Sequence, residues 1–525
     1  MKSYVRFRAA LAILGLLWAG SAICQPVRGG FHGLFQLPAT VAPLLPRAMP
    51  VRSCASLATT PPDGNITVRE ARTLRGEDGI GEWCRVTIEV TVPSARNVVT
   101  VWLMLPVQHW NGRFLGLGGG AWLPGFTDAL TTGASLGFAT AVTNAGRPYG
   151  LGIKPGDLNR LVSKNEFLVD ANGRLDWTAL ENFAYRGIHE MTVAGKAVAA
   201  KFYGAEPRYS YFSGCSTGGR QGQSEVQRYP ADYDGVLSGA PAINWAHFAA
   251  AEFWVRAVLD EHAVAQCKFE AAQQAALAAC DGDDGTVDGL VATVGTCRFD
   301  PKQLVGKQTE CGTIDVQDAE AIRRIWDGPR RRDGSRLWNG IDPTVLIHVP
   351  AAPAQWAAPF FAGKVPGADS YSVTAFESFF DSFVQRYGAV MDTSNPDLSA
   401  FAAHGGKILL WHGVADDIIP AAGTVHYVDS IRRQLGDRKT AQLLRFYLAP
   451  GVGHCSGGAG PQPVAMLTPL MEWVEHGRPP AALPGENWDK DGVTTRTRPL
   501  CPYPEDTRYK GQGALDDAAS FLCQK

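Results

Sequence analysis

Apolar residues in this chain fall into short runs that alternate with longer helical patterns. From Arg85 to Leu105 apolar and polar residues first alternate and then give way to an apolar run, which is the pattern of paired β-strands. Helical patterns, such as the one from Asn182 to Phe202, separate later runs. This order predicts an α/β fold, a mostly parallel sheet with helices on both faces. The later runs expected to be strands are Ala139–Thr143, Tyr209–Ser213, Gly235–Ser238, Ile408–His412 and Leu443–Leu448.

The alternation is interrupted between about residues 244 and 392, where the chain becomes rich in Ala, Trp and Phe. This segment follows one expected strand and precedes another, so it would emerge at the carboxyl edge of the sheet, where open α/β folds bind ligands. We therefore expect residues 23–243 and 393–525 to form the α/β domain and residues 244–392 to form an inserted domain that covers the site. The tail is expected to be irregular and pinned by a disulfide.

The N-terminus has the three-part layout of a secretory signal peptide. Basic residues precede the apolar run from Ala9 to Ala19, and small residues follow up to Ala22. We predict a signal peptide over residues 1–22 and a secreted or periplasmic protein; cleavage just beyond Cys24, or lipidation of Cys24, is the alternative. No other stretch approaches the roughly 20 apolar residues that cross a bilayer, so no membrane span is expected in the mature protein.

The overall composition is that of an ordinary globular protein. The 525 residues are 45% hydrophobic, and the net charge is -2. A chain with this charge balance has no basic stripe for a polyanion, which argues against a nucleic-acid partner and favours a small or neutral substrate.

Eleven cysteines in an exported chain indicate disulfides, and ten remain once Cys24 is set aside. One expected pair joins Cys215, which precedes Ser216, to Cys455, which follows His454. A disulfide holds its Cα atoms roughly 5.5–6 Å apart, so this pair would place the serine beside the imidazole. The other expected pairs are Cys54–Cys84, Cys280–Cys297, Cys501–Cys523 and, by elimination, Cys267–Cys311.

The pattern Gly-x-Ser-x-Gly occurs twice, around Ser135 and around Ser216. Ser216 follows a β-prone run and precedes a helical stretch that Pro230 ends, which is the strand–turn–helix setting of a nucleophile elbow. Ser135 instead precedes a strand and has no helix N-terminus to occupy. We therefore predict Ser216 as the nucleophile.

The partners of the serine are expected in the order acid and then histidine. The strand Ile408–His412 leads into a loop with Asp416 and Asp417, and a later strand leads into Gly453-His454-Cys455. His454 is the expected base, and either aspartate is a candidate for orienting it.

An oxyanion formed on attack needs two backbone N–H donors. The N–H of Thr217 is the first expected donor. The second is expected in the glycine loop, residues 118–121, which follows the strand-like run from Phe114; Gly119 or Gly120 is favoured.

Together these motifs resemble the tannase and feruloyl esterase family of α/β-hydrolases, which includes mono(2-hydroxyethyl) terephthalate hydrolases. The resemblance covers nearly the whole mature chain. It implies an α/β-hydrolase fold with an inserted lid, a bonded Cys215–Cys455 pair, Asp416 as the triad acid, and a secreted serine carboxylesterase acting on esters of aromatic carboxylic acids. The matching segments are Trp110–Leu115, Gly214–Gly219, Trp411–Asp416, Gly453–Cys455 and Arg498–Pro504.

The resemblance also implies a structural calcium ion in the lid and no cofactor for catalysis. The matching loop begins at Cys280 and is rich in aspartate and glycine. Its carboxylates and carbonyls supply the oxygen ligands that calcium prefers. The implied ligands are Asp281, Asp284 and Asp288 with the carbonyl groups of Thr286 and Leu290.

The sequence leaves three alternatives to this hypothesis. In the first, the activity is that of a mono(2-hydroxyethyl) terephthalate hydrolase. In the second, the chain is an inactive hydrolase fold that serves as a binding module, and in the third, Cys215 is the nucleophile in place of Ser216. The aromatic stretch from Phe376 to Tyr387 suits an aromatic acyl group, although such residues more often build a core.

Overall fold

The computed structural model describes residues 49–59, 64–76, 81–92, 95, 97–151, 166–347, 357–361 and 367–525. The predicted signal peptide, residues 1–22, and Cys24 lie outside these ranges. Among the described residues, no helix combines the length and apolar character needed to cross a bilayer.

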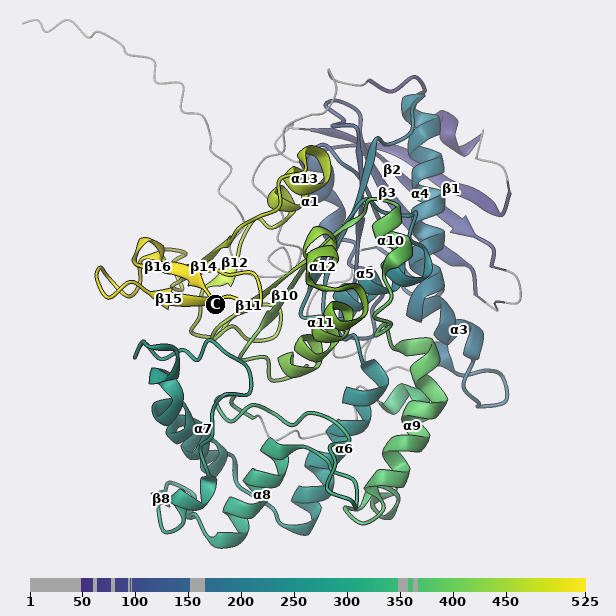
Figure 1. Cartoon of the computed structure of the whole chain (residues 1–525). Helices are drawn as coiled ribbons and strands as arrows, with labels where there is room; N and C mark the ends of the chain where they lie inside the picture. Colours follow the sequence, from purple (N-terminus) through teal and green to yellow (C-terminus); the bar gives the residue numbers. More distant parts are fainter. Residues whose placement is uncertain are drawn as a thin grey trace, which may run out of the picture.

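A nine-stranded sheet forms the centre of the protein (Figure 1). Its strands are β1 (Ile66–Arg75), β2 (Glu82–Val90), β3 (Val99–Pro106), β4 (Arg113–Leu117), β5 (Ala139–Thr143), β6 (Tyr209–Cys215), β7 (Gly235–Gly239), β10 (Lys407–Gly413) and β11 (Leu444–Ala449). The strand order is β1-β2-β3-β5-β4-β6-β7-β10-β11. The pairs from β5 to β11 are parallel, whereas β1–β2, β2–β3 and β3–β5 are antiparallel. The sheet is therefore mostly parallel, as predicted, with an antiparallel edge.

Burial follows the hydrophobic pattern of each strand. In β2 the alternate residues Cys84, Val86, Ile88 and Val90 are buried, as expected near an edge. The strands β4, β5 and β7 are buried at every position, because helices cover both faces of the sheet. One face packs against α4 (Gly187–Tyr203), α5 (Thr217–Arg228) and α11 (Ala421–Leu435), and the other against α1 (Ala129–Ser135) and α13 (Leu467–His476).

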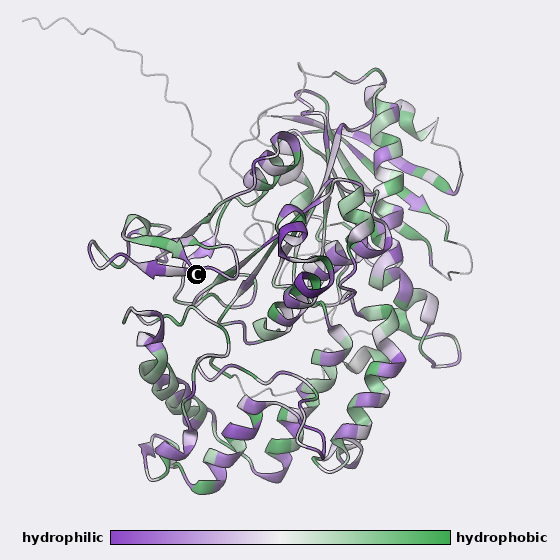
Figure 2. Cartoon of the chain, in the orientation of Figure 1, coloured by the Kyte–Doolittle hydropathy of each residue, from purple (hydrophilic) through white to green (hydrophobic). Residues whose placement is uncertain are grey.

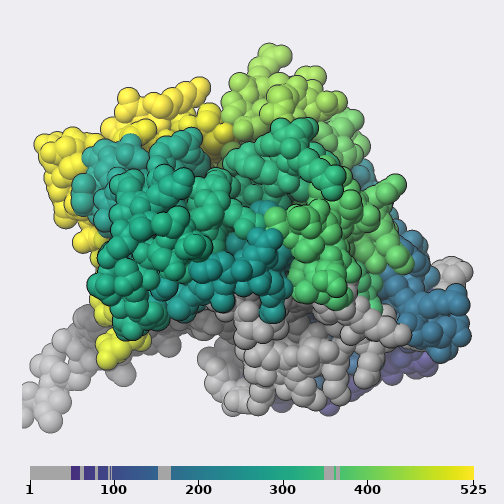
Figure 3. Space-filling view, turned by 90° about the horizontal axis from the view of Figure 1, so that it is seen from below, coloured from purple at the N-terminus to yellow at the C-terminus, as the bar shows by residue number. Residues whose placement is uncertain are grey.

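Four longer helices lie beneath the sheet in Figure 1 and belong to the segment between β7 and β10. They are α6 (Trp245–Glu261), α7 (Gln266–Cys280), α8 (Val316–Asp327) and α9 (Phe376–Met391), which we call the lid. Hydrophilic and hydrophobic residues alternate along α8 and α9 (Figure 2), as expected for helices with one buried face. Seen from below, the lid occupies the centre of the surface (Figure 3). The domain boundaries at residues 244 and 392 stay a prediction.

The lid has an aromatic core of its own. Phe380 and Phe383 of α9 are each 3% exposed and pack with residues of α6. The aromatic stretch from Phe376 to Tyr387 therefore builds the inside of the lid. At the two ends of the lid, the N–H of Thr393 donates to the carbonyl of Ile243 at 2.7 Å.

All five expected cysteine pairs are disulfides in the structure. The Cys501–Cys523 bond lies in a small C-terminal unit beside the sheet, which contains β12 (Gln462–Pro463), β13 (Leu483–Trp488), β14 (Thr494–Leu500), β15 (Asp506–Tyr509) and β16 (Phe521–Gln524). The remaining short elements include α3 (Trp177–Glu181), α10 (Ser399–Ala403), α12 (Asp437–Leu443), β8 (Gln308–Thr309) and β9 (Gly312–Thr313).

Candidate active site

Ser216 lies on a sharp turn between a strand and a helix. The strand β6 ends at Cys215, and α5 begins at Thr217. Ser216 itself has φ 63° and ψ -122°, a conformation that L residues seldom adopt. The chain approaches itself closely here: a Cβ on Gly214 would lie 2.6 Å from the carbonyl carbon of Gly218. The glycines of the motif therefore permit the turn.

The rival serine lies in a different setting. Ser135 is the last residue of α1, and its hydroxyl donates to the carbonyl of Thr131 at 2.8 Å. The segment before the strand β5 is thus a short helix, and Ser135 lies at its C-terminal end. In the described ranges no histidine is hydrogen-bonded to the hydroxyl of Ser135.

The structure brings Ser216, His454 and Asp416 into one hydrogen-bonded chain. The Oγ atom of Ser216 lies 2.9 Å from Nε2 of His454, and Nδ1 of His454 lies 2.8 Å from Oδ2 of Asp416. Both distances are those of good hydrogen bonds. Asp417 is exposed, and the carboxylate hydrogen-bonded to Nδ1 of His454 is that of Asp416, so Asp416 is the aspartate that reaches the imidazole.

The carboxylate of Asp416 is fully engaged. Its Oδ1 atom accepts the backbone N–H groups of Ile418 and Ile419. Its Oδ2 atom faces a second imidazole as well, because Nε2 of His412 lies 3.0 Å away. Our sequence reasoning missed His412, although it stands four residues before Asp416 at the end of β10.

The contacts between Asp416 and the imidazoles shift the pKa values of Asp416 and His454. Burial would raise the pKa of Asp416, but the charge of His454 and hydrogen bonds from both imidazoles outweigh it and hold that pKa well below its ordinary value. Burial would likewise lower the pKa of His454, but the Asp416 carboxylate outweighs it and raises that pKa above 6.5. The aspartate is therefore ionised, and the imidazole is more basic than a free one.

A disulfide ties the elbow to the loop that carries the histidine. Cys215 and Cys455 are bonded with a Cα–Cα distance of 6.0 Å, across 240 residues of sequence. Both cysteines are 3% exposed. Because Cys215 is bonded to another sulfur, it has no thiolate with which to attack a substrate.

The glycine loop packs against the start of α5. The hydroxyl of Thr217 donates to the carbonyl of Ala121, and the N–H of Gly218 donates to the carbonyl of Gly119. The N–H of Gly119 donates to Oε1 of Gln221 at 3.0 Å, and that of Gly120 donates to the carbonyl of Leu123 at 3.0 Å.

The two glycines that we favoured as oxyanion donors therefore have their N–H groups occupied. Within this loop and the elbow, the N–H groups of Ala121 and Thr217 have no recorded partner. Ala121 also has a positive φ of 51°, which turns its peptide away from the loop's regular path.

A cavity of about 530 Å³ opens beside His454. Lid residues on α7 and on the loop that follows it form one wall, and residues of the histidine loop, Gly451 to His454, form the other. Leu290 packs closely here, since a Cβ on Gly451 would lie 2.3 Å from its Cδ2 atom. The size suits a small molecule. Its apolar lining consists of Leu277, Leu290, Val291, Leu346, Val414 and Ile418.

The predicted calcium loop follows α7 and is fixed by its own carboxylates. Asp281 accepts the N–H groups of Gly289 and Leu290, and Asp288 pairs with Arg498 at 2.7 Å. Burial, together with the charges of Asp288 and Asp281, raises the pKa of Asp284 to about 6.

The implied ligand atoms of this loop are all oxygen atoms, which is the kind of ligand that a hard cation prefers. The raised pKa of Asp284 reflects its burial first and the neighbouring negative charges second. In the described part of the chain, however, Asp281, Asp284 and Asp288 are not among the groups whose ligand atoms lie within 4.8 Å of one another. Calcium binding remains a proposal.

The sheet, the elbow and the serine–histidine–aspartate arrangement define the chain as an α/β-hydrolase. The crystal structure of an esterase from Aspergillus oryzae shares this fold with a TM-score of 0.77 and 25% identity, covering 90% of this chain and 99% of its own.

The model of the tannase and feruloyl esterase family matches residues 84–524, so the chain belongs to this family and is a carboxylic ester hydrolase. A probable feruloyl esterase from Arthroderma benhamiae is 39% identical over 84% of this chain and 85% of its own length. The mono(2-hydroxyethyl) terephthalate hydrolase of Piscinibacter sakaiensis is 31% identical over 80% of each chain.

Proposed function

We propose that the protein is an exported serine carboxylesterase that hydrolyses esters of aromatic carboxylic acids. The observation that carries the proposal is the continuous hydrogen-bonded chain from Ser216 through His454 to Asp416. Because all three members of this hydrogen-bonded triad are present, the geometry argues against an inactive binding module, which does not need a triad.

The reaction proceeds through an acyl-enzyme. Oγ of Ser216 attacks the ester carbonyl while Nε2 of His454 takes its proton, and the tetrahedral intermediate collapses as His454 returns that proton to the departing alcohol. Water then attacks the acyl group and gives a proton to His454, which passes it to Ser216 as the acid leaves. Asp416 holds the imidazole in the tautomer that keeps Nε2 free to accept.

The oxyanion is held by the N–H groups of Thr217 and Ala121. This assignment rests on their having no other partner, whereas the N–H groups of Gly119 and Gly120 do. Two aimed backbone donors lower the barrier by a few kcal/mol each.

The substrate class rests on the cavity beside His454 and on the relatives. His454 lines this cavity although Ser216 does not, and the volume of about 530 Å³ is within the range of sites for small molecules. Its lining is mixed, with polar residues such as Gln273 and Thr344 beside Leu, Ile and Val. Relatives are named for feruloyl, tannin and terephthalate monoester substrates, so these are the esters to compare.

Export is supported by the five disulfides, which form in oxidising compartments, and by the signal-like N-terminus. Calcium would be held by Asp281, Asp284 and Asp288 with the carbonyl groups of Thr286 and Leu290. It would stabilise the lid without taking part in the reaction.

The test compares Ser216→Ala with Ser135→Ala, the serine of the second motif. A fluorophosphonate should label the wild type and Ser135→Ala but not Ser216→Ala, and the kcat of Ser216→Ala should fall by about 10⁶-fold. Rates on methyl ferulate, methyl p-coumarate, methyl gallate and mono(2-hydroxyethyl) terephthalate identify the acyl group. Retained activity in Ser216→Ala would overturn the mechanism; activity on aliphatic esters alone would overturn the substrate class.

A further inference from the structure

Three groups of side chains in the described ranges bring three metal-ligating atoms within 4.8 Å of one another. None of them belongs to the active site. They are Cys267 with Glu310 and Cys311; His262 with Asp315 and Asp318; and His189 with Glu225 and Asp232.

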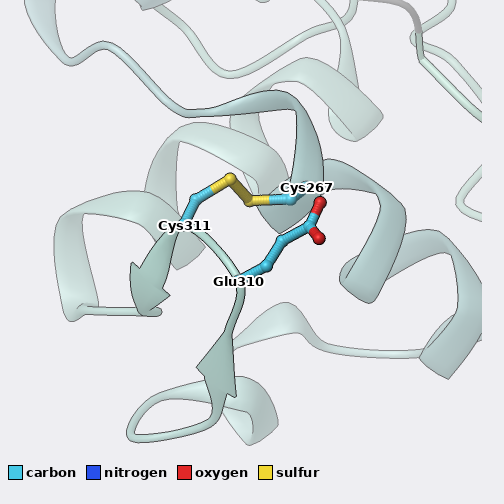
Figure 4. Close-up of side chains that lie close together, drawn as sticks. All are labelled: Cys267, Glu310 and Cys311. Carbon is cyan, nitrogen blue, oxygen red and sulfur yellow. A yellow bond between two sulfur atoms is a disulfide. The ribbon is translucent and has the colours of Figure 1, made fainter.

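In two of these groups, the ligand atoms already have other partners. Cys267 and Cys311 are bonded to each other, with the Glu310 carboxylate beside them (Figure 4), so neither sulfur is available as a thiolate. In the second group, the ammonium of Lys268 lies 2.6 Å from Oδ2 of Asp318 and supplies the positive charge that a metal ion would bring.

In the third group, no ammonium group that the structure describes pairs with the central carboxylate, that of Glu225. Glu225 lies on α5 and is 1% exposed, and in its ionised form neither carboxylate oxygen receives a hydrogen bond from a donor group. A buried carboxylate without a partner is costly. Burial, the charge of Asp232 and a hydrogen bond that the protonated carboxyl shares with Asp232 raise the pKa of Glu225 well above its ordinary value.

Among the described residues, Lys196 is the lysine whose charge acts on Glu225, and no hydrogen bond joins the two side chains. Lys196 donates to the backbone carbonyl of Asp232, and its ammonium lies 5.5 Å from the centre of the Tyr233 ring. Its charge is also shared with the carboxylates of Asp232 and Asp234. When Glu225, Asp232 and Asp234 are all ionised, their negative charges exceed the single positive charge of Lys196, and the group then attracts a cation.

Solvent reaches the group from one side. His189 of α4 has 29% of its side chain exposed and Asp232 has 14%, and Nδ1 of His189 lies 2.7 Å from Oδ2 of Asp232. The imidazole stacks on Tyr229 with 3.8 Å between ring centres, which fixes its plane. The group is therefore partly exposed on the side of His189 and Asp232, whereas Glu225 is buried.

We propose that His189, Glu225 and Asp232 form a binding site for a divalent transition-metal ion, with Zn²⁺ the best match. One imidazole and two carboxylates, with water in the fourth position, are a ligand set that Zn²⁺ accepts. The ion would link α4 to α5, the helix that begins at the elbow, and would have a structural role.

Calorimetric titration of the metal-free full-length protein with ZnCl₂, with calcium present throughout, tests this site. The wild type should bind one Zn²⁺ and gain thermal stability from it. Glu225→Gln, which keeps the shape of the side chain, and His189→Ala, at a partly exposed position, should each weaken binding by about 10–100-fold. His262→Ala removes the matching imidazole of the second group and should bind as the wild type does.

Zn²⁺ bound equally well by Glu225→Gln and His189→Ala, or not bound by the wild type, would overturn the proposal and leave Glu225 as a protonated acid beside Asp232. Ester hydrolysis without added zinc checks that each variant is folded.

Discussion

The Nε2 atom of His412 lies 3.0 Å from the Oδ2 atom of Asp416, the carboxylate oxygen that also receives His454. The same Nε2 lies 2.9 Å from the carbonyl oxygen of Ile419, so both of its neighbours are acceptors and it must carry the hydrogen. Nδ1 of His412 lies 2.9 Å from the hydroxyl of Thr424. His412 thus donates from Nε2 and positions the triad carboxylate.

Replacing His412 by phenylalanine should lower kcat by roughly 10–100-fold, because a hydrogen bond to a buried charge contributes about 1.5–3 kcal/mol. KM should change little, since His412 does not face the cavity. Steady-state kinetics measure both. His426→Phe, at an exposed position of α11, is the control. An unchanged kcat in His412→Phe would show that Asp416 needs no second imidazole.

Asp416→Asn should lower kcat by about 10⁴-fold, because the imidazole loses its orienting charge. The enzyme needs a neutral His454, and Asp416 raises the pKa of that imidazole; kcat/KM should therefore fall as the pH drops below this raised pKa. Without the carboxylate the pKa decreases, so the acid limb should move to lower pH. A pH profile measures the shift.

Asp417→Asn is the matched control for this experiment. Asp417 also raises the pKa of His454, but more weakly. The control should move the acid limb slightly in the same direction and keep a rate near that of the wild type. A loss in Asp417→Asn as large as in Asp416→Asn would contradict the assignment of the acid.

Removing the disulfide with Cys215→Ala and Cys455→Ala together should lower the free energy of unfolding by about 3–5 kcal/mol, near the top of the usual range, because the bond closes 240 residues. The kcat should fall as well, since the serine and histidine loops lose their link. Urea unfolding and ester hydrolysis provide the two measurements.

The Cys267–Cys311 bond supplies the comparison, since it spans 44 residues in the lid. Its double alanine variant should lose less stability and keep its kcat. Equal losses of kcat in the two variants would mean that the Cys215–Cys455 bond has no special effect on the triad.

Thr217→Val should lower kcat by about 10–100-fold, because the hydroxyl that fixes the carbonyl of Ala121 is lost and the proposed oxyanion donor moves. Thr217→Ser keeps that hydroxyl and should retain most of the rate. The same loss in both variants would point to packing rather than to the hydrogen bond.

Calcium should raise the melting temperature of the wild type, and removing it with EGTA should lower the melting temperature. The raised pKa of Asp284, about 6, means that its ionisation opposes folding, so in EGTA stability should decline as the pH rises from 4 to 7. Asp284→Asn should therefore stabilise the calcium-free protein at pH 7 and abolish the gain from calcium. A gain from calcium that survives Asp284→Asn would place the ion elsewhere.

The strands and the arrangement of the triad could be predicted because each depends on local signals. The run Ala139–Thr143 is β5 to the residue. Ser216, Asp416 and His454 each follow a parallel strand, and the carboxyl ends of parallel strands lie at one edge of the sheet. The pairing of the ten cysteines could be predicted because three of the bonds close short loops. The bond Cys215–Cys455 joins the residues beside the predicted serine and histidine, and the last pair follows by elimination.

The glycine run does not reveal which of its N–H groups are already hydrogen-bonded. The N–H of Gly119 is taken by Gln221, a side chain 102 residues away, and sequence gives no direction for a peptide group in a loop. The contact between His412 and Asp416 was missed for a related reason, since a histidine in a buried strand usually reads as part of the core. Such hydrogen bonds depend on the path that the backbone takes from the end of the strand into the next loop, and the sequence pattern does not specify that path.

The hydrogen bond between Thr393 and Ile243 brings the beginning and the end of the lid together at one point of the sheet. An insertion whose ends meet can change its length and sequence without pulling the hydrolytic machinery apart. The strands beneath could therefore keep their path while the inserted segment changes in size.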